Sequence, residues 1–156
     1  MSKTTKLPLK VGDSYTFIKT LSESDVYLFA GITGDFSQMH TNEQFMKKTM
    51  YKTRIAHGML SFAVGCTAST LLQKQVNSPI PSVSYGYDRV RFIKPVFFGD
   101  TLTCVYTITE VDEASLKTYG TLEVFNQHDQ ICVAATHILK FFPLENNTEA
   151  KETSTC

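Results

Sequence analysis

An aspartate and a histidine five residues apart, Asp35 and His40, are the residues of this chain best suited to chemistry. Gly34 should end a helix, and residues 35–41 follow neither a helical nor a strand period, so both side chains are expected on a loop. A histidine titrates near neutral pH, so His40 can serve as a general base while Asp35 holds or delivers a second proton. Such a dyad titrates as a pair rather than residue by residue.

Gly58 is the third candidate because it begins a long apolar segment. The first amides of a helix lack internal partners and carry the positive end of the helix dipole. Without a side chain, Gly58 would let an oxygen that gains negative charge approach its N–H closely and form an oxyanion hole. Each candidate also has a simpler explanation: Asp35 can be a turn or cap residue, His40 can bond a loop carbonyl, and Gly58 can merely permit close packing. His57 lies on the wrong side of Gly58 for a placed base, so it is interpreted either as structural or as a residue that supports the catalytic groups without reacting itself.

The segment after Gly58 is apolar nearly all round as far as Leu72, which predicts a buried central helix. Before it, a helix is expected over residues 23–33, capped by Ser22, and a short one over residues 43–49. Strand-forming composition favours an early strand at 15–18 and four later ones. The later strands are expected over residues 83–92, 101–111, 116–126 and 131–142 as one antiparallel meander.

These elements predict a single α+β domain, in which one long helix is wrapped by an antiparallel sheet of about five strands. The helices before it form an overhang. Residues 1–10 are expected to be a flexible arm, residues 11–142 the folded domain, and residues 143–156 a disordered polar tail. A sheet with exposed edges predicts pairing with a second copy, so a homodimer or higher homo-oligomer is expected.

Composition argues against several classes of protein. Lys plus Arg and Asp plus Glu both number 15, so nothing in the charge balance favours nucleic acid or an anionic membrane surface. No apolar run reaches the roughly 20 residues of a membrane helix, and residues 1–10 lack a signal peptide's apolar core. The four cysteines are widely spaced, which favours reduced thiols in a cytoplasmic protein and no metal site. Ser61 and Ser69 lack the Gly-x-Ser-x-Gly context of a nucleophile.

The sequence resembles the MaoC-like dehydratases, the (R)-specific enoyl-CoA hydratases with the hot-dog fold. The matching stretches are Phe29-Ala30-Gly31-Ile32-Thr33-Gly34-Asp35 with His40, then Ala56-His57-Gly58-Met59-Leu60, then the run from Arg91 to Leu102. The resemblance covers about residues 10–142. One departure concerns the family pattern Gly-Asp-x-Asn-Pro-x-His, whose Asn and Pro are Ser37 and Gln38 here, which puts the rigidity of the loop in question.

The resemblance implies reversible addition of water to trans-2-enoyl thioesters, with Asp35 and His40 as the catalytic dyad and the Gly58 N–H as the oxyanion hole. The substrate would be an acyl thioester of coenzyme A or acyl carrier protein, with no further cofactor. Arg89, Arg91 and Lys94 can meet coenzyme A phosphates, although a solvated strand face is the commoner explanation. Two rivals remain: a hot-dog thioesterase, and a non-catalytic acyl-thioester binding subunit.

Overall fold

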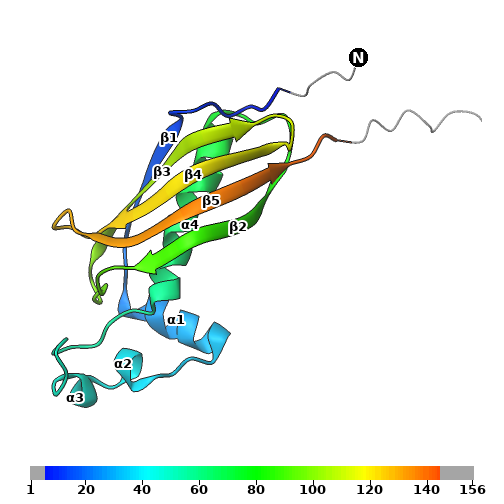
Figure 1. The fold of residues 1–156 in the computed structure, drawn as a ribbon. Coiled ribbons are helices and arrows are strands. Elements are labelled where there is room, and N and C mark those ends of the chain that lie inside the picture. Colours follow the sequence, from blue (N-terminus) through cyan, green and yellow to red (C-terminus); the bar gives the residue numbers. More distant parts are fainter. Residues whose placement is uncertain (1–5, 145–156) are drawn as a thin grey trace, which may run out of the picture.

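The computed structural model describes residues 6–144 and has a long helix partly enclosed by a curved sheet (Figure 1). The elements, in chain order, are β1 (Ser14–Thr20), α1 (Glu23–Thr33), α2 (Gln38–Thr41), α3 (Glu43–Met46), α4 (Gly58–Gln75), β2 (Ser82–Phe92), β3 (Thr101–Asp112), β4 (Lys117–Phe125) and β5 (Ile131–Phe141). The predicted α+β class is confirmed, and α1 has the bounds expected from its sequence. The strands differ from their predicted limits by no more than two residues at either end.

Within residues 6–144 the strands form one antiparallel sheet in the order β1-β3-β4-β5-β2. The predicted meander is correct for β3, β4 and β5 but wrong for β2, which pairs with β5 at the far edge. The segment 93–100 therefore carries the chain from β2, at one edge of the sheet, to β3, which lies next to the opposite edge strand β1. It is held by neighbours distant in sequence, since the Ala56 N–H donates to the Val96 carbonyl at 2.8 Å and the Leu21 N–H to the Asp100 carbonyl at 2.8 Å.

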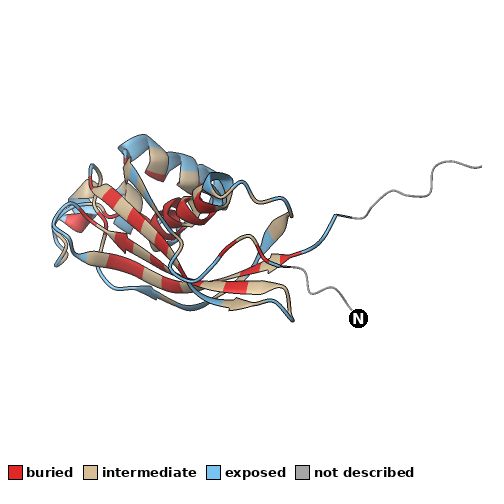
Figure 2. Cartoon of the chain, turned by 90° about the horizontal axis from the view of Figure 1, so that it is seen from above, coloured by how far each residue is buried: buried red, intermediate tan, exposed pale blue. Residues whose placement is uncertain are grey.

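The core lies between α4 and the inner face of the sheet, where buried residues of both layers meet (Figure 2). Strands β3 and β4 alternate between buried and partly exposed positions, as expected for a sheet with one covered face. Helix α4 packs against β1, β3, β4 and β5. Its buried side chains include Leu60, Phe62, Val64 and Leu72, which supports the prediction of a central buried helix.

The overhang before α4 consists of α1, α2 and α3, which lie beyond the N-terminal end of α4 in Figure 1. Ser22 begins α1 with a capping box to Asp25, and Gly34 ends it in the left-handed conformation at φ 78°. The expectation of a loop over residues 35–41 is wrong in its second half. Ser37 accepts a hydrogen bond from the N–H of Met39 and begins α2, so local capping creates a helical turn there.

Two further expectations concern the ends of the chain. Leu7 and Leu9 are 5% and 2% exposed and belong to the core, so residues 6–10 pack against the domain rather than forming a loose arm. Residues 1–5 and most of the predicted tail, residues 145–156, lie outside the described residues. No helix within residues 6–144 is long and apolar enough to cross a membrane.

Candidate active site

Asp35 follows directly after the left-handed Gly34 that ends α1, so its position is set by the end of that helix. Its Oδ1 accepts a hydrogen bond from the N–H of Ser37 at 3.2 Å, which is the local turn chemistry of an aspartate. The side chain nevertheless remains 54% exposed. The carboxylate of Asp35 therefore stabilises the local turn and is still exposed.

His40 lies on α2, and its ring is oriented by a residue far along the chain. Its Nδ1 is 2.7 Å from the backbone carbonyl oxygen of Ile55. A carbonyl only accepts hydrogen bonds, so Nδ1 carries the proton and the Nε2 lone pair of the neutral ring is free. This tautomer is the one that a general base needs.

The carboxylate of Asp35 and one ring nitrogen each of His40 and His57 lie within 4.8 Å of one another. A water molecule makes hydrogen bonds of about 2.8 Å, so one water can contact both Asp35 and His40 across such a gap. Within residues 6–144 these three side chains also satisfy the spacing for a metal ion. However, the two rings are stacked 3.7 Å apart, so their in-plane lone pairs do not converge well on a single ion, and the arrangement suits proton transfer better than metal binding.

Gly58 is the first residue of α4, where the backbone N–H has no partner inside the helix. A Cβ at this position would lie 2.9 Å from Cδ1 of Phe92, so only glycine fits beneath that ring as it stands. The simple packing explanation of Gly58 is thus supported, and it is compatible with a role in binding. Because close packing requires glycine here, residue 58 has no side chain of its own beside the N–H that an oxyanion would approach.

A cavity of about 530 Å³ brings Asp35, His40 and Gly58 together. Its apolar walls come from α1, from the segment after β2 and from β5, with Phe29, Val96 and Val133 among the side chains. An apolar space with a few convergent polar groups is the usual form of a small-molecule site. All three residues singled out from the sequence therefore line one cavity.

His57 also lines this cavity, which fits the second of the two interpretations made from the sequence, a residue that supports the catalytic groups. It is 4% exposed and its ring is stacked on that of His40, with ring centroids 3.7 Å apart. Its Nε2–H donates to the backbone carbonyl of Asp35 at 2.9 Å. The sequence showed only that a histidine precedes Gly58. It did not show the direction in which that side chain points.

Ser37 and Gln38, the departure from the family pattern, occupy the N-cap and first position of α2. Serine and asparagine are about equally good N-caps, while proline is favoured but not required at the first helical position. Ser37 accepts from Met39 and donates its own N–H to Asp35. The substitution therefore preserves the capping that holds the loop between the two dyad residues.

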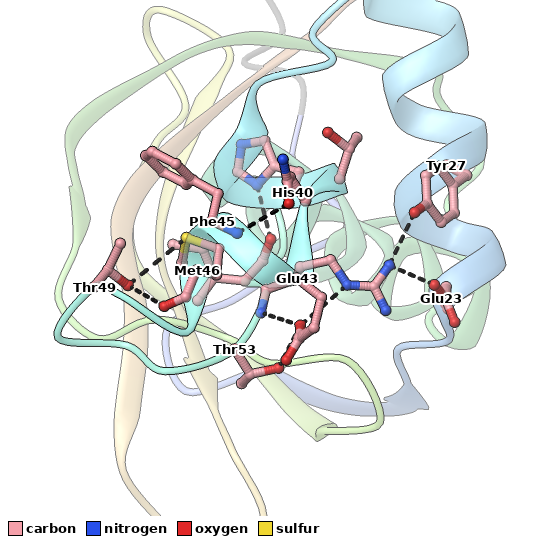
Figure 3. A network of polar contacts seen from close by, with 12 residues as sticks. Glu23, Tyr27, His40, Glu43, Phe45, Met46, Thr49 and Thr53 are labelled. Carbon is pink, nitrogen blue, oxygen red and sulfur yellow. Dashed lines mark hydrogen bonds and ion pairs between the residues drawn. The ribbon is translucent and has the colours of Figure 1, made fainter.

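The segment that orients His40 is anchored by Arg54, the neighbour of Ile55. Its Nη1 donates to Glu23 Oε1 at 2.6 Å and to the hydroxyl of Tyr27 at 2.9 Å, both on α1. Its Nε and backbone N–H both donate to Oε2 of Glu43 on α3. Figure 3 shows this network next to His40. One guanidinium thus connects α1, α3 and the chain segment whose carbonyl binds the His40 ring.

Other candidates from the sequence have simpler roles. Ser69 donates to the carbonyl of Cys66 at 2.9 Å, as a helical serine usually does, whereas buried Ser61 lines the cavity without a hydrogen-bond partner among the described atoms. Arg89 and Arg91 are exposed on β2, while Lys94 lines the cavity. Cys66, Cys104 and Cys132 are free thiols, and burial raises the pKa of each.

The chain is similar to proteins of one family over most of its length. Residues 8–129 match the family model described as "MaoC like domain". The chain is 41% identical over 115 residues to an (R)-specific enoyl-CoA hydratase of Rhodospirillum rubrum, covering 72% of this chain and 76% of that protein. It is 34% identical over 103 residues to a 3-hydroxybutyryl-CoA dehydratase of Methylorubrum extorquens, covering 66% and 62%.

Among solved structures, the (R)-hydratase of A. caviae superimposes with a TM-score of 0.74 at 28% identity, over 85% of this chain and 96% of that one. The hot-dog fold expected from the sequence is confirmed by this likeness and by the helix enclosed in its antiparallel sheet. The family model covers most of the chain, including the loop with Asp35 and His40 and the start of α4. This chain belongs to the family of MaoC-like domains.

Proposed function

We propose that this protein is a hydro-lyase that adds water reversibly to trans-2-enoyl thioesters and forms (R)-3-hydroxyacyl thioesters. The observation that carries the proposal is the His40 ring, which lies in one cluster with Asp35 and His57 and whose Nδ1–H is held by the Ile55 carbonyl, so that Nε2 is free to act as a base. Relatives named (R)-specific enoyl-CoA hydratase and 3-hydroxybutyryl-CoA dehydratase support the reaction class.

In the proposed hydration, Nε2 of His40 accepts a proton from a water molecule as the water oxygen bonds to C3 of the enoyl group. The electron pair of the double bond moves towards the thioester carbonyl, and C2 then takes a proton through Asp35. Water is consumed, and one proton returns for each proton removed, so the reaction balances without a redox partner. No cofactor beyond the thioester carrier is needed.

The developing negative charge on the thioester oxygen needs a hydrogen-bond donor. We assign this role to the N–H of Gly58 at the positive end of the α4 dipole. The acyl chain would occupy the apolar part of the cavity. Lys94, which lines the same cavity, is the cation we expect nearest to the carrier.

The two rival functions differ in what they require of the site. A hot-dog thioesterase with its acid on the central helix is disfavoured, because α4 contains neither aspartate nor glutamate. A non-catalytic thioester-binding subunit would be favoured if Ser37 and Gln38 loosened the loop that carries the dyad. The preserved capping of α2 by Ser37 weakens that alternative.

The test follows the loss of conjugated-thioester absorbance when the purified protein is mixed with a short trans-2-enoyl-CoA, with a thiol reagent in a parallel sample. We expect absorbance loss without thiol release, abolished by Asp35→Asn and by His40→Ala. Thiol release would instead identify a thioesterase. Full activity in either variant would contradict the dyad assignment, and His128→Ala on an exposed turn provides the matched control.

We also propose that the protein works as a homodimer in the cytoplasm. The edge strands β1 and β2 support the first part, because unpaired strand edges favour pairing with a second copy. Val83 and Tyr85 on β2 are 48% and 63% exposed, which adds apolar surface to that edge. Light scattering at working concentration should give twice the monomer mass, and a monomer would contradict the proposal.

A further inference from the structure

His57 is a buried polar residue of the cavity that the proposed reaction does not yet use. Its Nε2–H donates to the Asp35 carbonyl at 2.9 Å, and the same nitrogen is 3.9 Å from the Asp35 carboxylate. One face of the ring is stacked on His40 at 3.7 Å with an interplanar angle of 30°. Phe29 of α1 also contacts the ring, with centroids 5.1 Å apart. His57 is therefore in contact with both members of the dyad.

The tautomer of His57 follows from its hydrogen bond. A carbonyl accepts only, so Nε2 carries the proton in the neutral ring and Nδ1 is left as an acceptor. Nδ1 is buried and has no hydrogen-bond partner among the described atoms. An unpaired buried nitrogen costs free energy, and a residue needed for packing alone would avoid that cost with an apolar side chain of similar size. The histidine is thus better explained by what it does at the site.

We propose that His57 is the positioning residue of the dyad, which holds the Asp35 loop through Nε2–H and the plane of His40 through ring stacking. This inference rests on the proposed hydratase function. Two independent contacts act on the two dyad residues, so the distance between carboxylate and base is set by a third, rigid group at the start of α4.

The stacking also explains why His40 needs support from two sides. The Ile55 carbonyl holds one ring nitrogen, but a single hydrogen bond lets the ring tilt away and lose that bond for part of the time. His57 packs against the ring face and opposes that movement. Nε2 of His40 is then directed to one point in the cavity, where the attacking water must lie.

Three substitutions separate the two contacts. His57→Gln retains an amide donor for the Asp35 carbonyl but loses the ring, His57→Phe retains the ring but loses the donor, and His57→Leu loses both. We expect kcat to fall about 100-fold in His57→Leu, since a displacement of about 1 Å can cost this much. The losses in His57→Gln and His57→Phe should be smaller, with KM within about threefold of wild type in all three.

A spectroscopic readout keeps the test independent of turnover. With ¹⁵N-labelled histidine, nuclear magnetic resonance should show His40 as a single Nδ1–H tautomer in wild type, and His57→Leu should give a mixture of tautomers. His128→Leu, on an exposed turn, is the matched control and should change neither readout. If the wild type hydrates no enoyl thioester, the proposed function fails while the tautomer measurement still decides the role of His57.

Two results would overturn the positioning role. One is wild-type kcat in His57→Leu with an unchanged His40 spectrum. The other is an equal loss of kcat in all three variants that follows only a lowered unfolding temperature, with the His40 tautomer unchanged, which is the pattern of a purely structural residue.

Discussion

Acidification should destabilise this protein through one buried histidine of the core, His137. It is 1% exposed on β5, stacked on Tyr87 with ring centroids 4.2 Å apart and an interplanar angle of 8°. Its Nε2 is 2.9 Å from the hydroxyl of Ser84, while its Nδ1 has no hydrogen-bond partner among the described atoms. Burial disfavours the charged ring and lowers the pKa of His137 to about 4 from its ordinary value of 6.5.

The sign and size of the effect follow from that pKa. The folded state keeps His137 neutral down to about pH 4, whereas the unfolded chain binds a proton below about 6.5. The contribution of this residue to stability is therefore complete above the unfolded pKa and is lost as the pH falls from about 6.5 to about 4. The loss amounts to about 2 kcal/mol at pH 5 and approaches about 3 kcal/mol below the folded pKa.

The assay is urea unfolding at pH 7 and pH 5 of the wild type, His137→Gln and the control His128→Gln. The substitution of His137 will lower stability at both pH values, because the stack on Tyr87 is lost. The informative quantity is the difference in unfolding free energy between the two pH values. We expect that difference to be about 2 kcal/mol smaller in His137→Gln than in the wild type and in the control. An equal difference in all three proteins would refute the reasoning.

Two further substitutions test the parts of the fold that carry the site and the core. Arg54→Lys should lower stability by about 1–2 kcal/mol, since an ammonium cannot replace the several directed bonds of the guanidinium, and should lower kcat because the segment that orients His40 loosens. Unfolding and turnover measurements that match the wild type would contradict this. Gly120→Ala should cost about 1–3 kcal/mol in urea unfolding, because its Cβ would lie 2.7 Å from the fully buried ring of Tyr106. Gly86→Ala, with nothing within 4 Å of the new Cβ, is the control, and equal losses in the two would argue against overpacking.

Local signals were sufficient for much of the secondary structure. Ser22 and Gly34 delimit α1 because capping chemistry acts within a few residues of a helix end. Strand-forming composition located β3 and β4 to within one residue at each end, because strand propensity is also a property of short stretches of chain. The short helix α2 was missed because a single turn leaves no periodic pattern in the sequence.

These local signals could not predict the contacts between segments that are distant in the sequence. The pairing of β2 with β5 depends on where the segment 93–100 crosses, and that path is held by Leu21 and Ala56. Likewise, Leu7 and Leu9 are two apolar residues in a polar arm, and only the position of the arm against the domain buries them.

The same distinction applies to the candidate site, where the sequence indicated the residues but not their geometry. Residue types and spacing, together with the family resemblance, pointed to Asp35, His40 and Gly58, because the chemistry of a dyad and of a helix start is carried by short stretches of chain. The free Nε2 of His40 and the part played by His57 depend on the Ile55 carbonyl and on a ring stack. These hydrogen bonds and this stack join residues 15 or more positions apart, so their geometry exists only once the tertiary structure has brought those segments together.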